Sequence, residues 1–267
     1  MKLRSFAGRG WCAALVLVLL QGCASTPQLS APAKPDIDPW ESWNRKVFTF
    51  NDGLDHAVVK PTATAYRQFV PQFVRSGVGN FFGNFTDAWS AVNNLLQGKG
   101  ERGFSDIMRV GTNTVLGVFG LFDVATEAGI ERTREDFGQT LGVWGVPPGP
   151  YVVWPVFGPS SVRESMALPL DLSVTPAFAI NETAPLFGVA ILQLVHVRAN
   201  LLGASSLLDD VALDRYSFLR DAYLQRRRYL VYDGDPPEPP PDPDDADPAT
   251  EPEPKPDESN GNPRAGD

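Results

Sequence analysis

The segment from Gly142 to Val162, which reads GVWGVPPGPYVVWPVFGPSSV, constrains the fold more than any other part of the sequence. It contains four aromatic side chains, several glycines and five prolines. Proline fixes its own φ angle and has no backbone N–H, so neither an α-helix nor a central β-strand can run through the segment. We therefore predict a stiff, irregular segment without a ladder of strand hydrogen bonds.

The N-terminus has the pattern of an export signal. Three basic residues precede an apolar run over 13–20, which suits a signal peptide and is well short of the roughly 20 residues that a membrane-spanning helix needs. The run ends at Leu20-Gln21-Gly22-Cys23, which resembles the lipobox of bacterial lipoproteins. The resemblance implies that residues 1–22 are removed as a signal peptide and that Cys23 carries the acyl chains. A plain secretory signal with a chance cysteine is the alternative.

The residues around the lipobox also indicate a compartment. Ala24 resembles the sorting signal for the outer membrane, whereas aspartate at this position would indicate retention at the inner membrane. Cys12 is the only other cysteine and lies in the signal peptide, so the mature chain has no disulfide. The fold must therefore be stabilised by packing.

The net charge of −9 is unevenly distributed along the chain. Residues 233–267 hold twelve acidic side chains against two basic ones, and they are rich in proline and nearly free of large apolar residues. We expect this tail to be disordered. Residues 23–37 are also rich in proline and are predicted to be a tether to the bilayer. The domain between them, residues 38–232, is nearly neutral, which excludes the basic surface that nucleic-acid binding requires.

Residues 38–232 are predicted to be mostly helical. Asp38 is a candidate N-cap for the first helix, with Pro39 at its first position and Glu41 three residues after the cap. No sustained alternation of period two indicates a β-strand. The predicted helical ranges are 40–59, 72–97, 104–117, 186–202 and 206–232.

Two properties of these helices depart from an ordinary helical bundle. Glycines at 77, 79, 83, 111, 117 and 120 each cost roughly 1 kcal/mol in a helix, so they predict close approach between helices or bends. Residues 115–124 and 186–197 are strongly apolar but shorter than a membrane span. They are either core helices or helices that lie in one leaflet of a membrane.

Motifs that would indicate an enzyme are absent from the sequence. The chain has two histidines, His56 and His196, and neither an HExxH nor a GxSxG motif. The glycines at 77, 79 and 83 have the wrong spacing for a dinucleotide-binding loop. We expect no catalytic residues, no metal site and no cofactor, and a lipid-modifying enzyme is the least supported alternative.

A series of motifs occurs in the order found in the MlaA/VacJ outer-membrane lipoproteins, and this resemblance spans about 38–227. Its first motif includes Asp38, Pro39, Glu41, Asn44 and Arg45. The remaining matches are Val70-Pro71, Asn80-Phe81, NNLLQG at 93–98, Asn113-Thr114, Leu116-Gly117, DVA at 123–125, the block 135–163 and RDAYLQRR at 220–227.

The resemblance implies a single ring-like helical domain whose amphipathic helices lie in the inner leaflet of the outer membrane. It implies that the protein takes mislocalised phospholipid from the outer leaflet through a central channel and passes it to a periplasmic lipid carrier. Trimeric outer-membrane porins are the implied partners, without a cofactor. A porin-associated scaffold lipoprotein that transports nothing is the main alternative.

Two groups of residues are candidate sites. Trp144, Tyr151, Trp154 and Phe157 are predicted to contact lipid at the membrane interface, with a packed connector in the protein core as an equal alternative. Phe48, Phe50 and Asn51 resemble a segment near the family's channel where small changes alter lipid traffic. The alternative for Phe48 and Phe50 is packing in the core.

Overall fold

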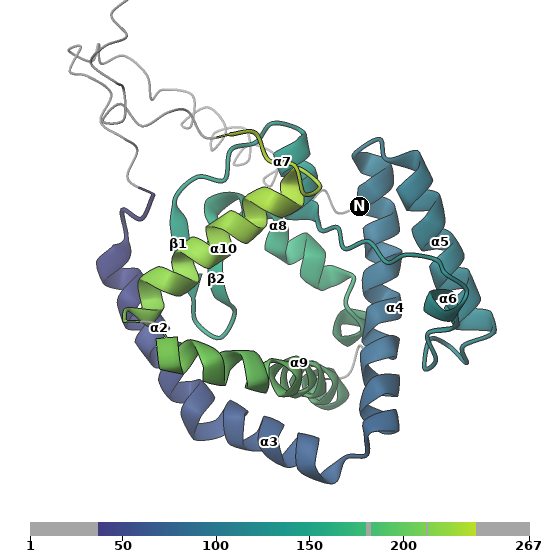
Figure 1. The fold of residues 1–267 in the computed structure, drawn as a ribbon, viewed down its shortest axis with the longest axis horizontal. Coiled ribbons are helices and arrows are strands. Elements are labelled where there is room, and N and C mark those ends of the chain that lie inside the picture. Colours follow the sequence, from purple (N-terminus) through teal and green to yellow (C-terminus); the bar gives the residue numbers. More distant parts are fainter. Residues whose placement is uncertain (1–36, 180–182, 212, 239–267) are drawn as a thin grey trace, which may run out of the picture.

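The computed structural model describes residues 37–179, 183–211 and 213–238, and this part of the chain is mostly helical, as predicted. The predicted signal peptide, the lipidation site Cys23, nearly all of the tether and the tail beyond residue 238 lie outside the described residues. Figure 1 shows α2 (Glu41–Leu54) on the left, α3 (Lys60–Phe69) along the bottom and α4 (Gln72–Leu96) on the right, and α5 (Gly100–Val115) lies on the outer side of α4. A ring shape with a channel stays a prediction.

The first long helical stretch consists of α2 (Glu41–Leu54), the π-helical turn η1 (Asp55–Val59) and α3 (Lys60–Phe69), which follow one another without a break. The prediction that the helix ends before Pro61 is therefore wrong. Pro61 lies at the second position of α3, where the π-helical hydrogen bonding changes to α-helical, so the proline without an N–H falls at this change. The wider π-helical turn precedes it.

The predicted N-cap role of Asp38 is also wrong. Trp40 occupies the cap position without a side-chain hydrogen bond, and only the backbone oxygen of Asp38 accepts from the N–H of Glu41. The Asp38 side chain is buried instead, where it accepts hydrogen bonds from Asn44 Nδ2 at 2.7 Å and from the Tyr216 hydroxyl. This carboxylate joins the start of α2 to a distant helix.

The next elements form an antiparallel helical hairpin. Its two helices are α4 (Gln72–Leu96), close to the predicted 72–97, and α5 (Gly100–Val115). A turn then leads to the short helix α6 (Val124–Glu127). Gly117 and Gly120 lie in this turn rather than inside a helix, and Gly120 has a φ of 84° that suits glycine.

The segment 142–162, called the Gly/Pro segment below, begins in the last turn of α7 (Phe137–Val143) and contains a β-hairpin. Strand β1 (Tyr151–Trp154) pairs antiparallel with β2 (Gly158–Ser161), so the prediction of a segment without a ladder is wrong. Pro159 opposes Val153 in this register. The sheet has only these two strands, and proline is tolerated in an edge strand because a free edge needs no N–H donor.

Four further helices follow the hairpin in the described residues. They are α8 (Val162–Ser173), the short 3₁₀ helix η2 (Pro176–Ala179), α9 (Thr183–Val211) and α10 (Arg215–Val231). The predicted single helix over 206–232 is wrong, because Asp214 accepts from the N–H groups of Tyr216 and Ser217 and so caps a new helix. The apolar run predicted over 186–197 to be shorter than a membrane span belongs to a longer apolar stretch. Pro185–Ser205 in α9 is long and apolar enough to cross a membrane, by length and composition, and only 17% of its most apolar window is buried.

Candidate functional site

The α4–α5 hairpin buries mainly polar side chains and exposes most of its large apolar side chains. Arg109 is 0% exposed although it is the largest fully buried side chain among the described residues. Soluble helices show the opposite arrangement, with an apolar stripe facing the core. The buried polar residues of the hairpin are Asn84, Asp87, Ser90, Asn93, Asn94, Asp106, Arg109 and Asn113. Its exposed large apolar residues are Phe73, Val74, Phe85, Val92, Leu95, Leu96, Phe104, Ile107, Met108 and Val115.

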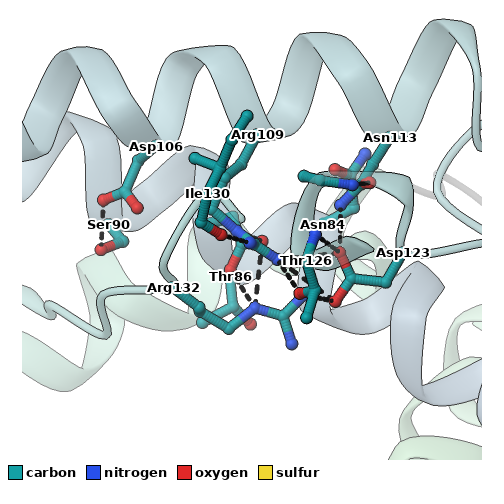
Figure 2. A network of polar contacts seen from close by, with 12 residues as sticks. Asn84, Thr86, Ser90, Asp106, Arg109, Asn113, Asp123, Thr126, Ile130 and Arg132 are labelled. Carbon is teal, nitrogen blue, oxygen red and sulfur yellow. Dashed lines mark hydrogen bonds and ion pairs between the residues drawn. The ribbon is translucent and has the colours of Figure 1, made fainter. Parts of the chain in front are cut away.

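The charges inside the hairpin compensate one another (Figure 2). The Arg109 guanidinium donates to Asp87 Oδ2 at 3.2 Å, to Asp123 Oδ1 at 2.9 Å and to the backbone oxygen of Ile130. Arg132 forms ion pairs with the same two carboxylates, at 3.0 Å from Asp87 and 3.4 Å from Asp123. Two arginines therefore neutralise two aspartates in the interior, as a stable buried charge network requires.

Neutral donors complete the network. Asp106 is fully buried and its Oδ2 accepts from Ser90 Oγ at 2.8 Å, from Asn94 Nδ2 at 2.9 Å and from the Thr133 hydroxyl. Most of these polar groups bind each other, so they hold α4, α5 and the following loop together. Among the described residues no group of three or more His, Cys, Asp or Glu side chains is arranged to hold a metal ion.

The two aspartates that bind Arg109, Asp87 and Asp123, have pKa values shifted in opposite directions. Burial raises the pKa of Asp87, although Arg132 and Arg109 both face it. Burial also acts to raise the pKa of Asp123, but hydrogen bonds from Thr126 and Asn113 and the charge of Arg109 outweigh it and lower that pKa to about 2. Asp123 therefore stays ionised at neutral pH and keeps its bond to Arg109.

The turn between α5 and α6 extends the apolar exterior. Val115 and Phe119 are 78% and 76% exposed, and Leu116, Val118 and Phe122 are exposed as well. Helix α9 adds further exposed apolar residues on the same molecule, which are Phe187, Ile191, Leu192, Leu194, Val197 and Leu201. Exposed apolar surface of this extent marks contact with a membrane or with another protein.

The apolar exterior and the polar interior fit a protein that contacts membrane lipid. A family model described as MlaA lipoprotein matches residues 36–230. The chain belongs to the MlaA lipoprotein family. The membership confirms the resemblance drawn from the motifs.

Relatives of the MlaA family match most of this chain. The "Intermembrane phospholipid transport system lipoprotein MlaA" of Shigella flexneri is 36% identical over 239 residues, which are 88% of this chain and 91% of that protein. The protein of the same name from Haemophilus influenzae is 31% identical over 230 residues, covering 83% of this chain and 90% of its own length. A solved structure from work titled "Structural basis for maintenance of bacterial outer membrane lipid asymmetry" has 35% identity and a TM-score of 0.65. It covers 73% of this chain and 98% of that chain.

The first MlaA motif ties α2 to the rest of the domain. Asn44 is fully buried and bonded to Asp38, while Pro39 and Glu41 are exposed. Arg45 pairs with Glu41 at 2.6 Å and with Asp214 at 2.8 Å, and its guanidinium lies 4.4 Å from the centre of the Tyr216 ring. The motif residues of α2 thus fix its position against α10.

The four aromatic residues predicted to contact lipid divide into two kinds. Tyr151 is 0% exposed and packs against Tyr216 and Tyr223, so its predicted lipid contact is wrong. Residues 151–153 of β1 are all buried, so both faces of the strand are covered at this end. Trp144, Trp154 and Phe157 are exposed.

The predicted gating residues also differ in environment. Phe48 is half-buried and packs edge-to-face on Tyr216, with ring centres 5.7 Å apart, which agrees with the packing alternative. Phe50 is exposed. Asn51 is bonded to the β-hairpin through both its amide oxygen and its amide nitrogen.

The Gly/Pro segment lines a pocket of about 930 Å³. The opposite wall is α10, which contributes Tyr223, Leu224 and Val231. Arg227 lies in this wall and binds Asp136 at 2.6 Å and Glu164 at 2.6 Å, which joins α10 to α7 and α8. These ion pairs therefore link α7, α8 and α10 beside the Gly/Pro segment.

The root of the acidic tail is bound to the domain. Asp233 lies 2.6 Å from both Lys99 and Arg102 at the start of α5. These are surface ion pairs, and such pairs contribute about 0.2–1 kcal/mol. Asp233, the first residue of the predicted tail, is thus in contact with the start of α5.

We expect truncation of the chain before Asp235 to leave the melting temperature unchanged, because the Asp233 ion pairs remain and the removed residues are polar and rich in proline. Asp233→Ala should instead lower the free energy of unfolding by about 1 kcal/mol. Thermal unfolding in detergent measures both variants. A large fall in melting temperature on truncation would show that residues beyond 235 pack on the domain.

Proposed function

We propose that this protein transports phospholipid between membranes and so maintains the lipid asymmetry of the outer membrane. In this proposal it removes mislocalised phospholipid from the outer leaflet and passes it to a periplasmic lipid carrier. Membership of the MlaA lipoprotein family supports the proposal, as do the names of its relatives in two other bacteria. The reversed polarity of the α4–α5 hairpin is the structural observation that carries it.

The reversed polarity supports transport because the hairpin exposes apolar side chains to lipid while its polar side chains stay hydrogen-bonded to one another inside. In hydrocarbon, unpaired polar groups cost several kcal/mol each, and the α4–α5 network pairs most of its own. The exposed surface is left free to contact acyl chains. Transport of this kind makes and breaks no covalent bond, so the proposal assigns no catalytic residue.

We propose that the domain lies in the inner leaflet of the outer membrane, anchored by acyl chains on Cys23. Residues 23–37 span at most about 50 Å when extended, which keeps the domain at the membrane surface. Trp144, Trp154 and Phe157 are the proposed contacts with the lipid interface, because indole and phenyl rings favour that region. Phe50 and Asn51 are proposed to affect the passage of lipid.

The proposed partners are a trimeric outer-membrane porin and a soluble periplasmic lipid carrier. The porin would present an apolar transmembrane wall to the exposed helices. The carrier would receive lipid at the aqueous side. Crosslinking in cells from exposed positions of α9, such as Phe187, identifies either partner.

The proposal is tested in cells that lack this protein. We expect phospholipid to accumulate in the outer leaflet, where a membrane-impermeant amine-reactive probe detects it on intact cells. The full chain should reverse the accumulation, and Cys23→Ser should not, because each buried CH₂ of the missing acyl chains contributes about 0.8 kcal/mol to membrane binding. A normal outer leaflet in the cells without the protein would favour a scaffold role over transport.

A further inference from the structure

Helix α2 binds the free edge of strand β1 in the way that a neighbouring strand would. Asn44 Nδ2 donates to the backbone oxygen of Tyr151 at 3.1 Å, and its Oδ1 accepts from the N–H of Val153 at 2.8 Å. Asn51 repeats this contact further along. Its Nδ2 donates to the backbone oxygen of Trp154 at 2.9 Å, and its Oδ1 accepts from the N–H of Val156 at 2.8 Å.

The spacing of the two asparagines matches the spacing of the strand. Asn44 and Asn51 are seven residues apart, which is about 10.5 Å along an α-helix. The backbone groups that they bind are offset by three residues, which is about 10 Å of extended chain. Alternate strand residues face opposite edges, so Asn44 binds the free edge of β1, whereas Asn51 binds the backbone at the end of the strand, where the chain turns into the tip. Two side-chain amides of α2 therefore hold the hairpin at its base and at its tip. An amide is needed at each position because it donates and accepts at once.

The second contact holds a strained residue. Val156 has a φ of 69°, and a β-branched residue is a true outlier in this left-handed region. Such a conformation persists only where its surroundings enforce it, and it often marks a functional position. Asn51 binds the N–H of Val156 directly. On the other side of the hairpin, Trp154 Nε1 donates to Ser165 Oγ at 2.8 Å.

The strained residue lies in an exposed apolar tip. Trp154, Val156 and Phe157 are all exposed, and Pro155 lies between them. The base of the hairpin is different, since Tyr151, Val152 and Val153 are buried. Asn44 thus binds the buried base, and Asn51 binds the end whose side chains face outward.

We propose that Asn51 is a positioning residue that fixes the apolar tip, residues 154–157, in its strained conformation, and that this tip contacts phospholipid during transport. The identity of the ligand rests on the proposed function, whereas the positioning of the tip by Asn51 does not. Without Asn51 the backbone of Val156 relaxes and the tip leaves its position beside α2. The rest of the hairpin stays in place because Asn44 and the β1–β2 ladder hold it.

The position of the tip is measured with spin labels at Gln68→Cys on α3 and Phe157→Cys at the tip. Gln68 is exposed and lies roughly 25 Å along the helical stretch from Asn51, which suits a distance measurement between labels. Cys12 leaves with the signal peptide and Cys23 is acylated, so no other thiol reacts in the lipidated full chain. We expect one narrow distance distribution when Asn51 is present. Asn51→Ala should abolish this single distance with little change in melting temperature.

Two further variants make the test specific. Thr49→Ala is the matched control, because Thr49 is an exposed α2 residue whose hydroxyl binds only Arg45 in its own helix, and it should leave the distance unchanged. Val156→Gly removes the strain, since glycine tolerates a positive φ. With Asn51 in place it should leave the narrow distance unchanged, because the amide contact rather than the valine side chain fixes the tip. Asn51→Leu removes both the donor and the acceptor at a similar volume, so it replaces Asn51→Ala if that variant does not fold.

The outcomes separate the inference from the proposed function. An unchanged distance distribution in both Asn51→Ala and Asn51→Leu would overturn the positioning role. A displaced tip with normal phospholipid in the outer leaflet would overturn the contact between the tip and its lipid. If cells without the protein keep a normal outer leaflet, the proposed function fails while the spin-label result still decides the position of the tip.

Discussion

Arg109→Met should lower the free energy of unfolding by about 3–5 kcal/mol, the effect of removing one partner from a buried ion network. The loss leaves Asp87 and Asp123 with Arg132 as their one remaining arginine in the described network. Methionine fills a similar volume, so the effect reports the charge rather than a cavity. Thermal and denaturant unfolding in detergent measure it.

Two variants serve as comparisons for Arg109→Met. Arg134→Met changes an exposed arginine in the loop that follows the network, and it should cost less than about 0.5 kcal/mol. Adding Asp123→Asn to Arg109→Met removes the excess negative charge and should recover part of the stability. If Arg109→Met unfolds at the same temperature as the unmodified protein, the buried network does not stabilise the α4–α5 hairpin.

Gly138→Ala should also destabilise the protein, although alanine is the better helix former. A Cβ atom at Gly138 would lie 1.6 Å from Glu164 Oε2 and 3.0 Å from Arg227 Nη2. The Glu164 carboxylate binds Arg163 and Arg227 at 2.6 Å each, so it cannot move without breaking an ion pair. We expect a loss of about 2–4 kcal/mol, from overpacking and from the disrupted pair.

The matched control for Gly138→Ala is Gly111→Ala in α5. No atom lies within 4 Å of a Cβ at Gly111, so this substitution should stabilise the helix by roughly 0.5–1 kcal/mol. The two variants make the same chemical change with opposite expected signs. Equal melting temperatures for both would contradict the close contact between α7 and the Glu164–Arg227 pair.

The helices were predictable where the pattern of residues determines them locally. The range of α4 agrees with its prediction because Pro71 precedes it and Gly98 follows it. The hairpin of β1 and β2 was missed because five prolines dominate the segment and only two short strands form. Asp38 was misread as a cap because its true partner, Tyr216, is 178 residues away.

The direction in which α5 faces could not be predicted from its periodicity. Asp106, Arg109 and Asn113 recur at spacings of three and four, which indicates one polar face of the helix. Periodicity separates the two faces but does not say which one is buried. The charged members of both helices, including Asp87, were the available signal, since buried charge requires partners on a neighbouring element.

The same uncertainty applied to the aromatic residues of the Gly/Pro segment. Tyr151 and Trp154 are three residues apart in one strand and so point to opposite faces, but this alternation does not say which face is buried. Whether each of these side chains is buried depends on the positions of α2 and α10. The sequence of the segment does not determine those positions. Only the contacts of Tyr151 with Tyr216 and Tyr223 settle its place.

The apolar exterior of the α4–α5 hairpin has a consequence for the life of the chain before it reaches a membrane. Val115, Phe119 and their neighbours would meet water throughout the crossing of an aqueous compartment, and apolar patches of this kind cause aggregation. The buried polar network cannot replace this apolar surface in water, because exposing the network would separate its ion pairs. We therefore expect a copy that crosses an aqueous compartment to need a partner protein that covers this surface and releases it at the bilayer.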